Sequence, residues 1–316
     1  MANLRETRAQ FLSAASRVLV GPTDNLELCL LALIVGGHVL LEGYPGTAKT
    51  LMAKTLARLT AGRFARVQFT PDLLPADIVG TVIYNQARAA FEVRPGPVFT
   101  DVLLADEINR SPAKTQAALL EAMEERQVTL DGLARPLGDR FTVLATQNPI
   151  ELEGTFPLPE AELDRFLMKI EVDYLNQEGE LQLARMVDRG FDPHSAEAAL
   201  GEPVITQAAL QALRQEVAGV SVSDPVMTYL TAVVQATRQA PELAVGASSR
   251  ATVALVRLAK GRAALLGRDF VEPEDVKELC VPVLRHRLQR RPEAEMQGLG
   301  EREVVERVLG RVPVPR

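Results

Sequence analysis

Residues 43–50 read Gly43-Tyr44-Pro45-Gly46-Thr47-Ala48-Lys49-Thr50. A short apolar run, 39–41, precedes this stretch, and a helix-favouring run that begins at Leu51 follows it. Because a strand, a glycine-rich loop and a helix follow in that order, the N–H groups of the turn and the helix N-terminus can form a concave anion site. Lys49 can reach the β- and γ-phosphates of a nucleotide, and the Thr50 hydroxyl can ligate Mg²⁺. The stretch from Gly43 to Leu51 therefore predicts a phosphate-binding loop. A chance glycine turn before a helix is the alternative.

Ala48 stands where the usual loop pattern has a glycine before the lysine. We expect an alanine to fit there only if its φ is negative and the phosphate does not need the space of the methyl group. We still expect the loop to bind a nucleotide with alanine at this position. The sequence does not predict how fast the nucleotide is hydrolysed.

The composition is that of an ordinary globular protein, with 316 residues, of which 47% are hydrophobic and 24% are charged. The net charge of −6 gives no global basic field that would attract nucleic acid or an anionic membrane. Cys29 and Cys280 lie far apart in the sequence, which suits a reducing compartment. The apolar run 28–35 is too short to span a bilayer, and residues 1–10 contain no apolar signal-peptide core. These features predict a cytoplasmic protein.

The pattern of predicted secondary structure changes near residue 175. Before this point, β-type runs alternate with helical stretches, which predicts a parallel sheet covered by helices on both faces. The five runs are 39–41, 65–69, 102–105, 141–145 and 166–172. We therefore expect residues 1–175 to form an α/β nucleotide-binding core with N-terminal helices.

Strand signals nearly vanish after residue 175. The pair Asp224-Pro225 is typical of a helix start, and an apolar stripe at helical spacing follows it, formed by Val226, Tyr229, Leu230, Val233 and Val234. Further helices are expected at 206–217, 250–266, 273–279 and 301–309. Residues 176–316 therefore predict a small helical domain with a C-terminal tail.

Two carboxylates end the apolar run 102–105, namely Asp106 and Glu107. Many such runs are strand ends that simply meet solvent. Together with the glycine-rich loop, however, this pair has the composition and order of a magnesium–nucleotide site. Asp106 would bind Mg²⁺ through its water shell, and Glu107 would polarise the water that attacks the γ-phosphate.

Two β-hairpins are expected as insertions in the core. The first pairs 82–84 with 91–93, and the second follows 128–130 with the turn Asp131-Gly132, a dipeptide that favours a tight turn with φ > 0. Surface decoration is the alternative to a functional role for both.

Three further polar residues are candidates for the site. Asn148 follows a β-type run and could position the attacking water, although a structural Asn-Pro turn is the alternative. Arg165 could pair with Glu162, lie on the surface, or reach the γ-phosphate of a neighbouring subunit. Arg250 stands at the start of a helix, where the helix dipole disfavours a cation unless an anion such as phosphate is near.

The order of these motifs resembles that of the AAA+ ATPases. More narrowly, it is similar to the MoxR family, in the clade with an insert in helix 2 and a hairpin before sensor 1. The resemblance covers nearly the whole chain, and its most specific phrases are 68–75 (QFTPDLLP), 105–125 (ADEINRSPAKTQAALLEAMEE), 145–149 (ATQNP) and 156–161 (FPLPEA).

The resemblance implies a P-loop αβα core with a five-stranded, mainly parallel sheet, followed by an all-α lid. It gives Asn148 the sensor 1 role, Arg165 the arginine-finger role and Arg250 the sensor 2 role. It further implies ATP and Mg²⁺ as cofactors and a ring oligomer, often a hexamer. A chaperone-like ATPase of this kind remodels client proteins, often with a von Willebrand A-domain partner.

Three other functions stay open. A nucleic-acid motor should carry basic and aromatic loops, yet the hairpin tips contain only Arg88 and Arg135 as basic residues. A nucleotide-binding switch without turnover conflicts with the presence of Glu107, Asn148 and Arg165. A subunit of a metal chelatase would share the core and require partner subunits. The sequence does not identify the client, the pathway or the ring size.

Overall fold

The computed structural model describes residues 4–149, 154–192 and 195–315. The chain forms two compact units. The first, the core unit, comprises Gln10–Pro159 and Ile170–Gln207. The second, the helical unit, comprises Glu160–Lys169 and Ala208–Arg316 together with the N-terminal stretch up to Ala9. Because each unit combines separate stretches, the functional boundary at residue 175 stays a prediction.

The core unit is built around a five-stranded sheet of order β2-β5-β8-β1-β9. Its strands are β1 (Val39–Glu42), β2 (Phe64–Gln68), β5 (Val102–Asp106), β8 (Thr142–Gln147) and β9 (Met168–Glu171). The pairs β2–β5, β5–β8 and β1–β8 are parallel. Leu40, Leu104 and Leu144 are fully buried at the centre of the sheet. The predicted five-stranded α/β core is confirmed.

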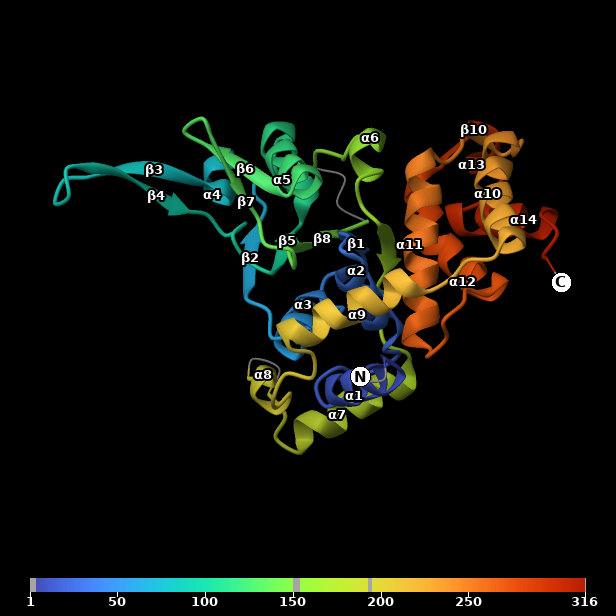
Figure 1. Cartoon of the computed structure of the whole chain (residues 1–316), viewed down its shortest axis with the longest axis horizontal. Coiled ribbons are helices and arrows are strands. Elements are labelled where there is room, and N and C mark those ends of the chain that lie inside the picture. The colour runs from blue at the N-terminus through green and yellow to red at the C-terminus, as the bar shows by residue number, and fades with distance from the viewer. Residues whose placement is uncertain (1–3, 150–153, 193–194, 316) are drawn as a thin grey trace. The chain divides into compact units, whose positions relative to one another are not determined.

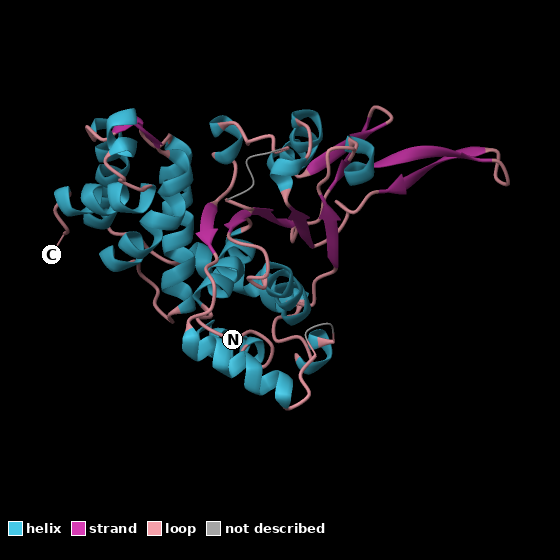
Figure 2. Ribbon diagram, turned by 180° about the vertical axis from the view of Figure 1, so that it is seen from behind, coloured by secondary structure: helices cyan, strands magenta, loops and turns pink. Residues whose placement is uncertain are grey.

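Helices cover both faces of this sheet (Figures 1 and 2). Helices α2 (Asp24–Val35) and α3 (Lys49–Leu59) lie on one face, and α4 (Pro75–Val79) and α5 (Ala113–Glu125) on the other. The remaining helices assigned wholly or partly to the core unit are α1 (Leu4–Ala15), η1 (Ile108–Arg110), α7 (Gln177–Asp188) and α8 (Ala196–Ala199). Helix α7 begins at an N-cap, Asn176, whose side chain accepts a hydrogen bond from the Gly179 N–H at 2.9 Å.

Both predicted hairpins are present. Strands β3 (Gly80–Asn85) and β4 (Ala90–Pro95) pair antiparallel, and this hairpin extends well beyond its neighbours in the core unit (Figure 1). Strands β6 (Gln127–Leu130) and β7 (Leu133–Pro136) form the second. Its turn residues Asp131 and Gly132 have φ values of 52° and 73°, as the Asp-Gly dipeptide predicts.

The helical unit confirms the predicted apolar stripe. Val226, Tyr229 and Leu230 of α10 (Asp224–Gln239) are all buried. Its other elements are α6 (Glu160–Leu163), α9 (Gln207–Gly219), β10 (Leu243–Val245), α11 (Ser249–Leu265), α12 (Pro273–Leu284), η2 (Arg285–Arg287), β11 (Gln289–Arg290), α13 (Pro292–Met296) and α14 (Glu301–Arg311). The antiparallel pair β10–β11 was not expected in an all-helical domain.

Helix α12 is longer than the sequence suggested. We expected it to end at residue 279, but it continues through Pro282 to Leu284. Val283 and Leu284 are fully buried, so their packing outweighs the loss of one helical hydrogen bond at the proline. In the described part of the chain, no helix combines the length and apolar character needed to cross a bilayer.

The backbone of Ala48 contradicts our expectation. Its φ is +59° and its ψ is 20°, which places the residue in the left-handed region as the N-cap of α3. The expectation of a negative φ was wrong because the chain must turn left-handed immediately before the helix begins. An alanine pays about 1–2 kcal/mol for this conformation, whereas glycine does not.

Replacing Ala48 with glycine should therefore raise the free energy of unfolding of the core unit by about 1 kcal/mol. Denaturant unfolding followed by circular dichroism measures this change. The matched control is Ala117→Gly, at an exposed position inside α5 of the same unit, which should lower the stability by about 1 kcal/mol. A loss of stability in Ala48→Gly as large as that in the control would contradict the strain at Ala48.

Candidate nucleotide site

The glycine-rich loop is shaped by its two glycines. A Cβ at Gly43 would collide with the carbonyl oxygen of Val172, so only glycine allows the chain to pass this close to the end of β9. Gly46 has a φ of +83° and open space where a Cβ would stand. The turn therefore leaves its backbone accessible, as an anion-binding loop requires.

Lys49 is folded back onto this loop. Its Nζ donates hydrogen bonds to the carbonyl oxygens of Gly43 and Tyr44 at 2.7 and 2.6 Å, and to Thr47 Oγ1 at 3.1 Å. Burial lowers the pKa of the Lys49 ammonium, and the carboxylates of Asp106 and Glu107 oppose this shift. The loop with Lys49 follows β1, and the two predicted carboxylates lie at the end of β5. Because both strands pair in parallel with β8, the loop and the carboxylates lie at the same edge of the sheet.

Thr146 links the two carboxylate residues at the end of β5. Its Oγ1 donates to Asp106 Oδ1 at 2.6 Å and accepts a hydrogen bond from the Glu107 N–H at 2.8 Å. Glu107 itself has a φ of +57°, a conformation that is strained for a residue with a side chain. Strain of this kind concentrates at functional sites, where surrounding contacts hold it in place.

Three polar side chains that the sequence analysis did not single out contact the same carboxylates. Arg66 donates twice to Asp106 Oδ2, from Nε at 3.0 Å and Nη2 at 2.6 Å. Gln68 Nε2 and Arg110 Nη1 donate to Glu107 Oε2 at 2.8 and 3.0 Å. The contacts of Arg66 and Gln68 depend on the pairing of β2 with β5, in which Gln68 lies opposite Asp106, whereas Arg110 is a local partner three residues after Glu107.

The other predicted residues of the core unit lie near these groups in the chain. Thr50 and Leu51 form the first turn of α3 directly after Lys49. Asn148 is half-buried immediately after β8, the strand that carries Thr146. Tyr44 stacks face to face on Tyr174 with ring centroids 4.9 Å apart, which fixes its ring beside the loop. Pro45 is exposed at the turn.

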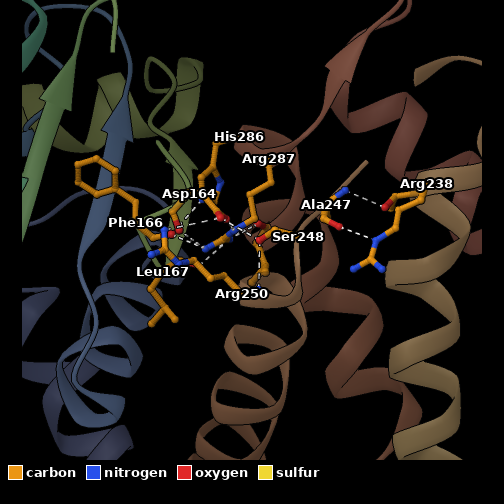
Figure 3. Close-up of polar contacts among 11 residues, drawn as sticks. Asp164, Phe166, Leu167, Arg238, Ala247, Ser248, Arg250, His286 and Arg287 are labelled. Atoms are coloured by element: carbon orange, nitrogen blue, oxygen red, sulfur yellow. Dashed lines mark hydrogen bonds and ion pairs between the residues drawn. The ribbon is translucent and has the colours of Figure 1, made fainter. Parts of the chain in front are cut away.

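Arg165 and Arg250 both belong to the helical unit. Arg165 is half-buried two residues after the end of α6, and Arg250 lies in the first turn of α11. Within this unit, Arg250 Nη1 stands 3.9 Å from Asp164 Oδ2, so an acidic side chain offsets the dipole at the helix N-terminus (Figure 3). The approach of either arginine to a nucleotide stays a prediction.

The residues of the core unit fit a nucleotide with Mg²⁺. The open loop at Gly46 and the lysine ammonium suit phosphate oxygens, which are acceptors and anions. A threonine hydroxyl and a carboxylate, here Thr50 and Asp106, are the hard oxygen donors that Mg²⁺ prefers.

Comparisons with known proteins agree with this geometry. Residues 38–168 match the family model of the ATPase family associated with various cellular activities (AAA), and residues 235–308 match an AAA lid domain. The chain is 44% identical to the chaperone MoxR1 of Mycobacterium tuberculosis, over 95% of this chain and 80% of that protein. It is 45% identical to the uncharacterized protein YeaC of Bacillus subtilis, over 95% of this chain and 92% of that protein.

A solved structure extends the comparison to three dimensions. The crystal structure of a protein from Cytophaga hutchinsonii is similar with a TM-score of 0.90 and 42% identity, covering 99% of this chain and 96% of that one. The fold therefore agrees over almost the whole length. Together with the relatives named MoxR and the matching AAA models, this shows that the chain belongs to the MoxR family of AAA+ ATPases.

Proposed function

We propose that this protein hydrolyses ATP in a Mg²⁺-dependent reaction, as a ring oligomer that remodels or activates client proteins. The observation that carries this proposal is that the open glycine-rich loop follows β1 and that Asp106 and Glu107 lie at the end of β5; both strands pair in parallel with β8, so these groups lie at one edge of the sheet. The name of the Mycobacterium tuberculosis relative, a chaperone, supports a protein client. A hexameric ring, a von Willebrand A-domain partner and a cytoplasmic location are parts of the same proposal.

The chain's own residues can perform each part of the reaction. The loop N–H groups and Lys49 hold the triphosphate, and Asn148 orients a water molecule toward the γ-phosphorus. As the water oxygen bonds to phosphorus, its proton passes to the Glu107 carboxylate, and the bridging oxygen leaves with ADP. Mg²⁺ held by Thr50 and Asp106 would neutralise charge on the phosphate oxygens.

Arginine residues complete the proposed site. Arg165 of one subunit stabilises the charge that develops on the γ-phosphate in the pocket of the next subunit. Arg250 contacts the nucleotide from the lid of the same subunit. Loss of the γ-phosphate then releases both cations, which allows the lid and the ring to change their geometry.

The hairpins are the proposed contact with the client. The rings of Tyr84 and Phe91 meet edge to face at 5.3 Å on the β3–β4 hairpin, where they are 54% and 74% exposed. Exposed aromatic pairs are typical of surfaces that bind other proteins. Arg88, the basic residue of this hairpin tip, is paired with Glu92 at 2.9 Å, so the tip offers little positive charge to nucleic acid.

Replacing Glu107 with glutamine should lower the rate of phosphate release roughly 100-fold or more, because the amide cannot accept the proton of the attacking water. Binding of a fluorescent ATP analogue should be retained. The control Glu121→Gln changes an exposed carboxylate on α5 and should leave both measurements unchanged. Unaltered turnover in Glu107→Gln would contradict the role of this residue.

A mixing experiment tests the shared pocket. Lys49→Ala and Arg165→Ala should each be nearly inactive alone. Mixed in equal amounts, they should recover about a quarter of the wild-type rate, because half of the pockets are intact and half of those meet an intact arginine from the neighbour. Absence of recovery in mixed rings would contradict an arginine supplied between subunits.

The aromatic pair can be tested with casein as an extended polypeptide. Casein should stimulate phosphate release by the wild-type protein, and Phe91→Ser combined with Tyr84→Ser should lose most of this stimulation while keeping the basal rate. Removal of the 131–137 loop should have the same effect. The control is Leu181→Ser on α7, which removes an exposed apolar side chain elsewhere in the core unit. Equal stimulation of the wild-type and the double variant would contradict a client role for the first hairpin.

A further inference from the structure

Arg287 is a buried arginine of the helical unit that the proposed reaction does not yet use. It ends η2, and its side chain is only 3% exposed. Burying a guanidinium is costly unless a counter-ion and hydrogen-bond acceptors surround it. Among the described residues, the hydrogen-bond partners of Arg287 lie in the segment 164–167 and at Val283 of α12, the helix that precedes η2.

The partners of Arg287 include three backbone carbonyls in the segment 164–167. Nη2 donates to the carbonyl oxygens of Asp164 at 3.2 Å and of Phe166 at 2.6 Å, and Nη1 donates to that of Leu167 at 3.2 Å (Figure 3). Nη1 also donates to the carbonyl oxygen of Val283 in α12. The segment is therefore held through its backbone on both sides of residue 165.

Asp164 is the counter-ion of this arginine. Arg287 Nε donates to Asp164 Oδ1 at 2.7 Å. Burial lowers the pKa of Arg287, and the hydrogen bond and charge of Asp164 oppose that shift. His286 adds a further contact to the segment, with Nε2 3.0 Å from the Phe166 carbonyl oxygen. Burial and the neighbouring Arg287 hold the pKa of His286 well below its usual range, so its neutral ring donates this hydrogen bond from Nε2.

The second carboxylate oxygen of Asp164 faces the start of α11. Asp164 Oδ2 accepts a hydrogen bond from Ser248 Oγ at 2.8 Å, and Ser248 Oγ in turn caps α11 by accepting from the Arg250 N–H at 3.1 Å. The Asp164 carboxylate thus accepts hydrogen bonds from both Arg287 and Ser248, the N-cap of the helix that carries Arg250.

The loop before α11 is itself fixed to α10. Arg238 Nε donates to the Ala247 carbonyl oxygen at 2.9 Å, and the Ala247 N–H donates to Thr237 Oγ1 at 3.0 Å. A Cβ at Gly246 would stand 2.6 Å from the Arg238 Cα, so the loop lies directly against the helix. Ser248, the partner of Asp164, therefore belongs to a loop that is held against α10.

We propose that Arg287 is a positioning residue for Arg165. We further propose that Asp164 couples the position of the backbone at Arg165 to the position of the backbone at Arg250. This inference rests on the proposed function, in which Arg165 acts on the pocket of the neighbouring subunit. By holding the carbonyls before and after residue 165, Arg287 fixes the backbone from which the Arg165 side chain leaves. A movement of the backbone at Arg250 would be transmitted to the segment 164–167 through the hydrogen bonds of Ser248 and Asp164.

The alternative role for Arg287 is general support of the helical unit. The two roles predict loss of ATP hydrolysis in different nucleotide pockets of the ring. Loss of positioning disables the pocket of the neighbour and leaves the variant's own pocket competent. Loss of general lid structure disables the variant's own pocket, because Arg250 acts there. Complementation between variants separates these outcomes.

The test uses Arg287→Gln in mixed rings. Alone, this variant should lose at least roughly tenfold in phosphate release, as Arg165→Ala does, while it still binds a fluorescent ATP analogue. Mixed with Lys49→Ala, which has a dead pocket and an intact Arg165, it should recover about a quarter of the wild-type rate. Mixed with Arg165→Ala, it should recover nothing.

Two variants serve as controls. Arg268→Gln removes a bidentate ion pair to Asp275 in the same unit, at 2.6 and 2.8 Å, without touching the segment 164–167. It should keep most of its activity, and any residual defect should not follow the complementation pattern of Arg165→Ala. Arg287→Lys retains the charge but cannot make the same set of hydrogen bonds, so it should show a smaller loss with the same complementation pattern and covers the case in which the glutamine variant does not fold.

The outcomes distinguish this inference from the proposed function. If Lys49→Ala rescues Arg165→Ala but neither Arg287 variant, Arg287 is a structural support and the inference is overturned. If Lys49→Ala rescues none of them, the arginine supplied between subunits is itself refuted, and the inference fails with it. Rescue of both Arg165→Ala and the Arg287 variants by Lys49→Ala supports the positioning role.

Discussion

Parallel pairing of β1, β8 and β5 is the constraint on which the candidate site depends. Because these strands run in the same direction, their carboxyl ends meet at one edge of the sheet. The glycine-rich loop follows β1 there, Asp106 and Glu107 lie at the end of β5, and Thr146 lies near the end of β8. The buried strand residues fix the register, and the register fixes the hydrogen bonds of Thr146 to both acidic residues. The arrangement of these polar groups is thus a consequence of sheet packing.

Two of the described non-glycine residues with a positive φ lie at the same edge. Ala48 and Glu107 both have positive φ values, although neither is a glycine. In the proposed reaction, Ala48 precedes the lysine that binds the phosphates, and Glu107 accepts the proton of the attacking water. The tightly packed sheet supplies the stability that tolerates this strain, which is a common arrangement at functional sites.

Much of the fold could be predicted from the sequence, because its signals are local. Apolar runs located the five strands, and Asp131-Gly132 located the second hairpin turn. Predictions from the local sequence were wrong where contacts with distant residues determine the backbone conformation. Helix α12 passes through Pro282 because Val283 and Leu284 are buried, and the sign of φ at Ala48 depends on the geometry of the whole turn.

The candidate site was predictable to the extent that its residues belong to contiguous motifs. Lys49, Asp106 and Glu107 were predicted in this way, and the parallel strands β1 and β5 carry their motifs to the same edge of the sheet. Arg66 and Gln68 were missed because their contacts require the strand order. Arg287 was missed because it lies 123 residues along the chain from Asp164. Long-range partners of this kind carry no spacing signal.

The central claim is an ATP site completed by an arginine from an adjoining subunit. Its most direct test is the rate of phosphate release per subunit, measured with saturating Mg²⁺ and ATP across a dilution series, alongside native mass spectrometry. We predict that the rate rises with protein concentration and reaches a plateau as the oligomer forms. A rate per subunit that is independent of concentration, or the absence of phosphate release from the assembled oligomer, would contradict this account.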